Sequence, residues 1–279
     1  MSATIEQLIQ SAGELPSMPQ VTQKALTIIR SPEADPAELA SILSMDQVLT
    51  SLVLRWSNSA HFGIKSRVAT VHHAIMVLGM NTLRELLLAS SVSRYLNRPV
   101  PGYDLKQGEL WKHSMGVATG ARMVTEHISR KLSEEAYYAG LMCDIGKLAF
   151  EKLLRTSDVS LPEWNGNTFL EMERKHFGVD HAMLGAEMAR RWHLPDELVA
   201  AIAYHHNPSE AQDFVMIASA VHVADAAMMM LGVGVGKDGL KYELDSEALK
   251  LLKIDDQDLI TLLDKIMAEI QMAEILISY

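Results

Sequence analysis

The spacing of apolar residues constrains the fold of this chain more than any other feature. In DPAELASILSMDQVLTSLVLRW, residues 35–56, apolar side chains recur every three or four positions and fall near one helical face. The same spacing appears at 74–96, which reads as one helix or a helix pair, and at 255–277. No alternating run rich in Val, Ile and Thr is bounded by Asn-Gly or Gly-Gly. The sequence therefore predicts an all-α fold with little or no sheet.

Residues suited to capping or breaking helices mark the expected helix ends. An aspartate or serine before a periodic apolar run accepts hydrogen bonds from the free amides of the first turn. The chain places such residues at three starts: Asp35 ahead of Pro36, Ser133 ahead of EEAYYAGLM, and Asp255 with Asp258. The Leu194-Pro195 step should end one helix and begin the next, because the residue before proline avoids helical geometry.

Two stretches rich in glycine or proline divide the chain. NRPVPGYD, residues 97–104, interrupts the helical pattern, and GVGVGKDG, residues 232–239, precedes the last helices. The second stretch lacks the G-x-x-x-x-G-K-[ST] spacing and follows a helix, so we interpret it as a loop without a phosphate-binding role. The predicted organisation is an N-terminal helical bundle over 1–100, a second helical domain over 101–235, and C-terminal helices over 236–279.

Charge and cysteine content restrict the partners and the compartment. A net charge of −10 over 279 residues provides no overall attraction for nucleic acid or an anionic membrane. A single cysteine rules out an intrachain disulfide, which is typical of a reducing compartment. MSATIEQLIQSAGELP lacks the features of a signal peptide, and the apolar run VMIASAVHVADAAMMML contains His222 and Asp225, which are costly in a bilayer. We expect a cytoplasmic protein that binds neither membranes nor nucleic acid.

Histidines and aspartates lie inside apolar helices in the middle of the chain: His113, Asp144, His181, His205, His206 and Asp225. Such groups are costly to bury unless they are paired or ligated. A divalent metal would satisfy several at once, and imidazole with carboxylate suits zinc, iron or manganese. Each residue also has a plainer interpretation, such as a hydrogen-bonded core histidine or an imidazole at a helix C-terminus. The chain has 11 histidines, so coincidence competes with ligation.

The order of these residues resembles the motif of the HD superfamily of metal-dependent phosphohydrolases. That motif runs from a histidine to a His-Asp doublet, later histidines and a final aspartate. The doublet here reads Cys143-Asp144, and the following DIGKL includes Lys147. The later histidines are similar to those of the subgroup that hydrolyses cyclic di-GMP with two or three metals. In this resemblance Lys147 would contact a substrate phosphate; as a plain residue it would be a solvated lysine.

The flanking sequence resembles the HDOD domain, a relative of the HD phosphohydrolases. The likeness lies in LPSMPQV, LRWSNSAHFG, VHHAIMVLGMNTLRELLLA and FGVDHAMLGAEMARRWHLPDELVAAIAYHH, and covers about residues 11–230. It implies an N-terminal helical bundle packed on an HD-like helical domain. It also implies a signalling or regulatory module, a class in which the metal motif is often eroded and catalysis is not demonstrated.

Cys143 alters the first of the metal sites that the resemblance implies. The doublet histidine of the family binds one metal, and its aspartate bridges to a second. A thiolate binds zinc at about 2.3 Å, but cysteine is shorter than histidine and a buried thiol tends to stay protonated. We therefore favour a packed thiol over a ligand. The remaining residues would hold one divalent ion, either iron, manganese or zinc.

Two functions follow from these patterns. The favoured one is a non-catalytic signalling module that binds an unidentified signalling protein, with a nucleotide as a further ligand. Arg55, Trp56 and Asn58 would then form an exposed recognition element, or else a structural junction. The other is a metal-dependent phosphohydrolase acting on a nucleotide or cyclic dinucleotide, against which Cys143 argues. Methionines in the last helices would either form an interface or cover the core: Met228, Met229, Met230, Met267 and Met272.

Overall fold

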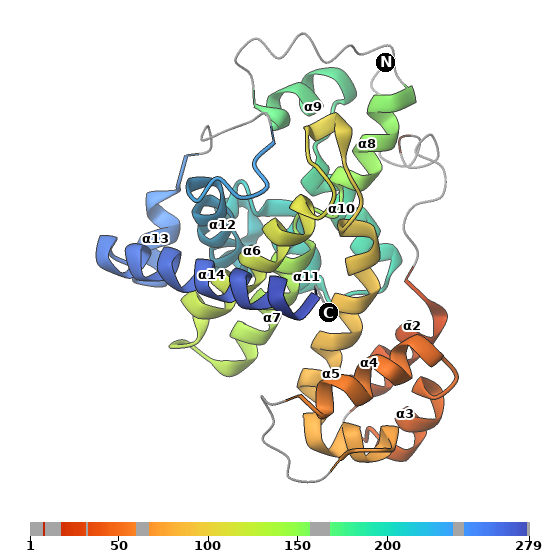
Figure 1. Cartoon of the computed structure of the whole chain (residues 1–279). Coiled ribbons are helices and arrows are strands. Elements are labelled where there is room, and N and C mark those ends of the chain that lie inside the picture. Colours follow the sequence, from red (N-terminus) through yellow and green to blue (C-terminus); the bar gives the residue numbers. More distant parts are fainter. Residues whose placement is uncertain are drawn as a thin grey trace. The chain divides into compact units, whose positions relative to one another are not determined.

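The computed structural model of this chain describes residues 8, 18–31, 33–59, 67–156, 168–236 and 243–277. Within these ranges the chain is helical and contains no β-strand; an isolated antiparallel bridge joins Val100 and Leu105. The predicted all-α fold is confirmed (Figure 1). Contacts divide the chain into a smaller unit, Pro16–Arg94, and a larger unit that includes Tyr95–Tyr279.

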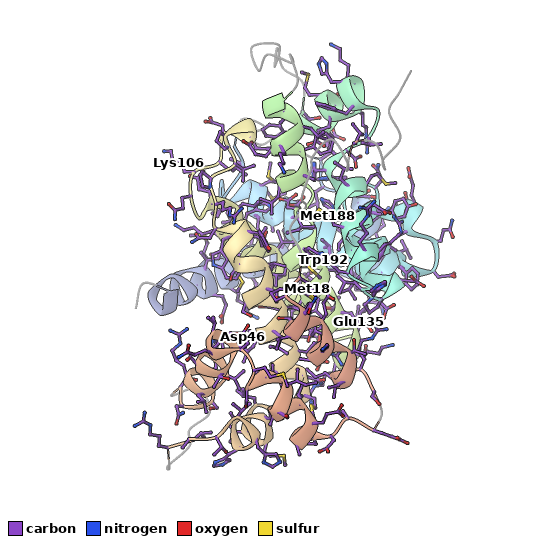
Figure 2. The ribbon with its side chains drawn as sticks, turned by 90° about the vertical axis from the view of Figure 1, so that its right-hand side faces the viewer. Met18, Asp46, Lys106, Glu135, Met188 and Trp192 are labelled. Atoms are coloured by element: carbon purple, nitrogen blue, oxygen red, sulfur yellow. The ribbon has the colours of Figure 1, made fainter. Side chains whose placement is uncertain are left out.

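The smaller unit consists of α2 (Gln20–Ile29), α3 (Pro36–Leu43), α4 (Gln47–Ser57) and most of α5 (Val71–Leu96). Asp35 caps α3 by accepting from the amide of Ala37 at 2.8 Å, as predicted. Asp46, labelled in Figure 2, caps α4 by accepting from two amides. Backbone angles at Gly79, with φ 74° and ψ 163°, break α5 into two helical parts. The predicted helix pair is therefore present, joined at this glycine.

The larger unit contains the remaining helices. In chain order they are η2 (Pro101–Tyr103), α6 (Glu109–Thr125), α7 (Arg130–Met142), α8 (Lys147–Thr156), α9 (Phe169–Phe177), α10 (His181–Arg191), α11 (Asp196–Tyr204), η4 (Pro208–Phe214), α12 (Val215–Met230), α13 (Ser246–Leu252) and α14 (Asp256–Ile277). Helix α12 packs against α6, α7, α11 and α13, and it is buried along nearly its whole length. This central position explains why its sequence is apolar on all faces.

Most of the predicted helix ends are where the capping pattern placed them. Asp255 and Asp258 exchange backbone-to-carboxylate hydrogen bonds at the start of α14. Helix α10 ends before Pro195 and α11 follows it directly. The prediction for Ser133 is wrong. Helix α7 begins one turn earlier, capped by Ser129, and Ser133 lies buried inside it because the intervening Arg, Lys and Leu are good helix formers.

The C-terminal helix covers the core of the larger unit. Helix α14 packs against α6 and α12, burying Leu262, Ile266 and Ile270. This contact bears out the core-covering alternative for the last helices. Among the described residues, the segment 208–230 is long and apolar enough to cross a membrane, but 72% of its qualifying window is buried within the protein. The two parts of α5 meet the same criterion only when counted together across a 62° bend.

Candidate metal centre

The predicted histidine and aspartate donors meet in the interior of the larger unit. His113 lies in α6, Asp144 follows α7 and His181 opens α10. His205 and His206 directly follow α11, and Asp225 lies in α12. Three sets of three side chains each bring their donor atoms within 4.8 Å of one another. The sets are His113, Asp144 and Asp225; His181, His205 and His206; and Cys143, Asp144 and His205. The chain therefore gathers the predicted residues into one cluster.

The turn between α7 and α8 brings Asp144 to this cluster. Gly146 in this turn lies directly against the backbone of α10. A Cβ atom there would overlap the carbonyl oxygen of His181 and lie 2.7 Å from the amide nitrogen of Gly185. Because glycine has no Cβ, α10 approaches closely enough to place His181 Nε2 3.3 Å from Asp144 Oδ1. The glycine of the DIGK stretch thus has a packing role in the site.

The first set places an imidazole between two carboxylates. His113 Nε2 lies 2.8 Å from Asp225 Oδ1 and 3.5 Å from Asp144 Oδ2. His113 Nδ1 lies 2.9 Å from the carbonyl oxygen of Val233, an acceptor, so Nδ1 carries a proton. Burial lowers the pKa of His113, but Asp225 and Asp144 raise it more, so it is raised overall. Nε2 and the two carboxylates therefore share a proton or another cation.

The second set contains three imidazoles. His181 Nδ1 donates to Glu173 Oε2 at 2.8 Å, and His181 Nε2 lies 3.0 Å from His206 Nε2. Burial lowers the pKa of His181, but Glu173 and Asp144 raise it more, to about 10. Burial lowers the pKa of His205. Burial also lowers the pKa of His206, and the neighbouring His205 and His181 rings lower it more. Neutral imidazole is the form that binds metals, and two of these rings are held neutral.

Lys147 neutralises part of the charge on Asp144. Its ammonium donates to Asp144 Oδ2 at 2.8 Å, and its side chain is 11% exposed. Burial would raise the pKa of Asp144, but Lys147, His181 and His113 lower it well below its ordinary value. The interpretation of Lys147 as a solvated lysine is wrong, since the start of α8 turns its side chain inward. Its contact with a substrate phosphate stays a prediction.

Cys143 directly follows α7, and its thiol is buried. Its sulfur donates to the carbonyl oxygen of Gly140 at 3.2 Å. Burial raises the pKa of the thiol well above its ordinary value, and the charges of Asp144 and Asp225 raise it further. The resemblance placed position 143 with His113 and Asp225, but the structure groups the sulfur with Asp144 and His205.

The sequence does not predict the groups that orient the histidines through hydrogen bonds. Glu173 is 3% exposed and accepts from both the backbone nitrogen and Nδ1 of His181. Tyr103 donates to the other oxygen of Glu173 at 2.5 Å. An acidic residue eight positions before a candidate ligand is a weak signal, and the charged neighbours in EMERKH made Glu173 look like a surface residue. The carbonyl of Val233 has no sequence signature at all.

The donor set fits a divalent metal ion. His113, His181 and His205 each direct Nδ1 to a carbonyl or carboxylate, which leaves Nε2 facing the cluster. Outer partners of this kind orient ligating histidines in metal sites. His205 Nε2 is buried without a hydrogen-bond partner among the described residues. Ligand atoms at about 2.0–2.2 Å from one ion lie within about 4.4 Å of each other, which is close to the spacing seen here.

The predicted recognition residues lie in the smaller unit, at the end of α4. Arg55 and Trp56 are exposed, Trp56 to 38%. The side chain of Asn58 donates to the carbonyl oxygens of Leu54 and Val68 and accepts from the amide of Val68, at 2.7–2.8 Å. Asn58 thus joins the end of α4 to the segment before α5. Residues 60–63 of LRWSNSAHFG lie outside the described residues.

Together, the all-helical fold and the buried histidine–aspartate cluster define a protein of the HD type. The HDOD domain family model matches residues 15–208 of this chain. The chain therefore belongs to the HDOD domain family. Asp225, which completes the first set, and Val233, whose carbonyl orients His113, lie beyond the matched range.

Known proteins share this fold. The chain is similar to an HDOD domain protein of unknown function from Geobacter sulfurreducens, with a TM-score of 0.70, 24% identity, and coverage of 97% and 98% of the two chains. The chain is also similar to a candidate phosphohydrolase from Shewanella amazonensis SB2B. Here the TM-score is 0.68 and the identity 27%, and the match covers 94% of this chain and 93% of the other. An uncharacterized protein of Treponema pallidum (strain Nichols) is 25% identical over 244 residues, 83% of this chain. The chain spans 45% of the length of that relative.

Proposed function

We propose that this HDOD protein is a regulatory module of signal transduction, which holds a divalent metal ion in its interior and acts by binding a partner protein. The observation that carries this proposal is the thiol of Cys143 at the position of the doublet histidine. The thiol donates to the carbonyl of Gly140, while the other donors of the cluster remain in place. The centre keeps what it needs to bind an ion and lacks one imidazole that the phosphohydrolase motif requires.

The burial of the cluster argues against turnover of a phosphoester. Two metals normally clamp the attacking and leaving oxygens of such a substrate. The side chains of His113, Asp144 and His181 are at most 2% exposed, and those of His206 and Asp225 are 8% and 9% exposed. A bound ion would therefore meet solvent only at one edge of the cluster. Such an ion holds several helices together, which is a structural and regulatory role.

The outer face of α4 supports the binding of a partner protein. Met45, just before this helix, and Val48, in its first turn, are each 75% exposed. Val48, Arg55 and Trp56 stand at i, i+7 and i+8, so they share one helical face. Exposed apolar side chains beside an arginine and an aromatic residue are typical of protein interfaces.

The proposal is tested by metal analysis and turnover assays on the full chain. We expect purified protein to contain bound metal and to leave bis(p-nitrophenyl) phosphate and cyclic di-GMP intact. Asp144→Asn should lose the metal, since Asp144 belongs to two of the three donor sets. Metal-dependent hydrolysis that Asp144→Asn abolishes would overturn the non-catalytic proposal. Protein without metal, after growth and purification with zinc, iron and manganese supplied in turn, would overturn the metal-binding part.

The partner contact needs a test of its own. Val48→Glu places a charge on the exposed face of α4, and Lys265→Glu places the same charge on the exposed face of α14. A protein that co-purifies with the wild-type chain should be lost with Val48→Glu and kept with Lys265→Glu, while the helical circular dichroism of both variants is unchanged. Equal recovery with both variants would contradict a role for α4.

A metal-dependent phosphohydrolase is the second candidate function. The retention of all six predicted donors favours it, as does the 27% identity to the candidate phosphohydrolase of Shewanella amazonensis. A metal at this centre would polarise a phosphoryl oxygen. If the missing imidazole is what prevents turnover, Cys143→His should produce metal-dependent hydrolysis in a chain that otherwise shows none.

A further inference from the structure

The third donor set contains the clearest unsatisfied atom of the centre. His205 is fully buried, and its Nε2 has no hydrogen-bond partner among the described residues. A buried polar atom without a partner is costly, so its presence needs a physical reason. The donor atoms of Cys143, Asp144 and His205 lie within 4.8 Å of one another, and no residue of this set is exposed. An ion between them would satisfy this nitrogen.

Hydrogen bonds hold both the ring and the backbone carbonyl of His205. Its Nδ1 lies 2.8 Å from the carbonyl oxygen of Ile202, so the proton is on Nδ1 and the lone pair is on Nε2. Its own carbonyl oxygen accepts from His222 Nδ1 at 2.8 Å. The amide of Asp245, which caps α13, donates to His222 Nε2 at 2.9 Å. The chain thus fixes both the tautomer and the backbone of His205, as outer partners do in metal sites.

We propose that Cys143, Asp144 and His205 bind a thiophilic divalent cation of the zinc class, with the cysteine sulfur as a direct ligand. The inference rests on the proposed function, in which the interior of this protein holds a metal. Sulfur, imidazole and carboxylate together favour zinc or cadmium over manganese or magnesium, which prefer oxygen ligands. Cys143 therefore changes which ion the centre selects.

Binding at this site releases one proton. In the structure the thiol proton is donated to the carbonyl of Gly140. When the cation binds, the S–H bond breaks, the sulfur forms a bond to the metal with its electron pair, and the proton leaves to the buffer. His205 is already neutral at Nε2 and needs to lose nothing. The positive charge of the cation also offsets the carboxylate of Asp144.

The test uses cadmium as a spectroscopic probe on the full chain. Titration of metal-free wild-type protein with Cd²⁺ should produce the ultraviolet absorption of a thiolate–cadmium bond, with one proton released per ion. Cys143→Ser should show no such band and should bind Zn²⁺ at least about tenfold more weakly, while Mn²⁺ affinity changes by less than about twofold. His205→Gln is the second variant, and it should weaken Zn²⁺ binding similarly.

X-ray absorption of the zinc-loaded wild-type protein is a second test, and its result does not depend on whether the variants fold. We expect one sulfur neighbour at about 2.3 Å from zinc. A zinc environment of nitrogen and oxygen alone would overturn the inference and return Cys143 to a packed residue, while the proposed metal-binding function would stand. Absence of bound zinc, cadmium, manganese and iron would overturn this inference together with the metal-binding part of the proposed function.

Discussion

Replacing Glu173 by glutamine tests whether the cluster depends on its outer carboxylate. Glu173 accepts from the backbone nitrogen of His181 at 2.7 Å and from its Nδ1 at 2.8 Å. Glu173 and Asp144 together raise the pKa of His181 from 6.5 to about 10 in spite of its burial. At about 1.4 kcal/mol per pKa unit, this corresponds to about 5 kcal/mol of preference for the protonated ring in the folded state. Glu173→Gln should remove about 2–3 kcal/mol of stability, since hydrogen bonds to charged groups contribute about that much.

The stability lost in Glu173→Gln should depend on pH, and the pKa of His181 sets the direction. The pKa of His181 is higher in the folded protein than its ordinary value of 6.5. The stabilisation is therefore fully present below pH 6.5 and is lost as the pH rises through about 10. Urea unfolding of protein freed of metal by a chelator should show the largest difference between wild type and Glu173→Gln near pH 6. That difference should fall to about 1 kcal/mol near pH 10, because the ring of His181 is losing its charge there and its ion pair with Glu173 is reduced to hydrogen bonds.

Glu187→Gln provides the matched control. Glu187 lies on α10, like His181, and pairs on the surface with Arg190 and Arg191 at 3.3 and 3.2 Å. Its replacement should cost less than about 1 kcal/mol, with no trend between pH 6 and 10, because exposed ion pairs are weak. The reasoning is refuted if Glu173→Gln loses the same stability at both ends of this range, or if both variants behave alike.

Three further substitutions test the packing within each of the two units. Gly234→Ala would place a Cβ 2.6 Å from the Cβ of His113. Gly232→Ala is the control, because Gly232 also has a positive φ but an added Cβ there meets no atom within 4 Å. Metal affinity measured by calorimetry should therefore fall in Gly234→Ala and not in Gly232→Ala. Gly146→Ala should cost about 3 kcal/mol or more in thermal unfolding because its Cβ meets the backbone of α10; an unchanged melting temperature would contradict the close approach. Asn58→Ala should lower the free energy of unfolding by about 1–2 kcal/mol. Its metal content should not change, because the hydrogen bonds of Asn58 stay within the smaller unit. An altered metal content would contradict this.

The sequence predicts which histidines and aspartates cluster better than it predicts the groups that orient them. His113 and Asp225 could be found because polar residues in apolar helices need a partner, and the structure places them 2.8 Å apart. Ser133 was a poor guide to the start of α7, because Ser129 has an equal capping ability and the residues between them also favour helix. Local preferences locate a helix but leave its first turn ambiguous.

The sequence predicts the burial of Cys143 but not the groups that its sulfur faces, for a different reason. The resemblance indicates which positions meet, but the direction of a short side chain depends on the turn between α7 and α8. That turn is set by the contact of Gly146 with α10, which joins residues far apart in the sequence. The same holds for the carbonyl of Val233, since every residue has a carbonyl and only tertiary packing selects one.

Hydrogen bonds link the centre to residues that follow α12. His113 is oriented by the carbonyl of Val233, and the backbone of His205 is linked through His222 to the amide of Asp245 at the start of α13. An ion that binds the folded arrangement stabilises every element needed to build it, by about 2.7 kcal/mol at a free concentration 100 times the dissociation constant. Metal binding should therefore stabilise residues 231–236 and the start of α13 as well as the helices that carry the candidate ligands. A change in metal occupancy would reach the start of α13 through these contacts.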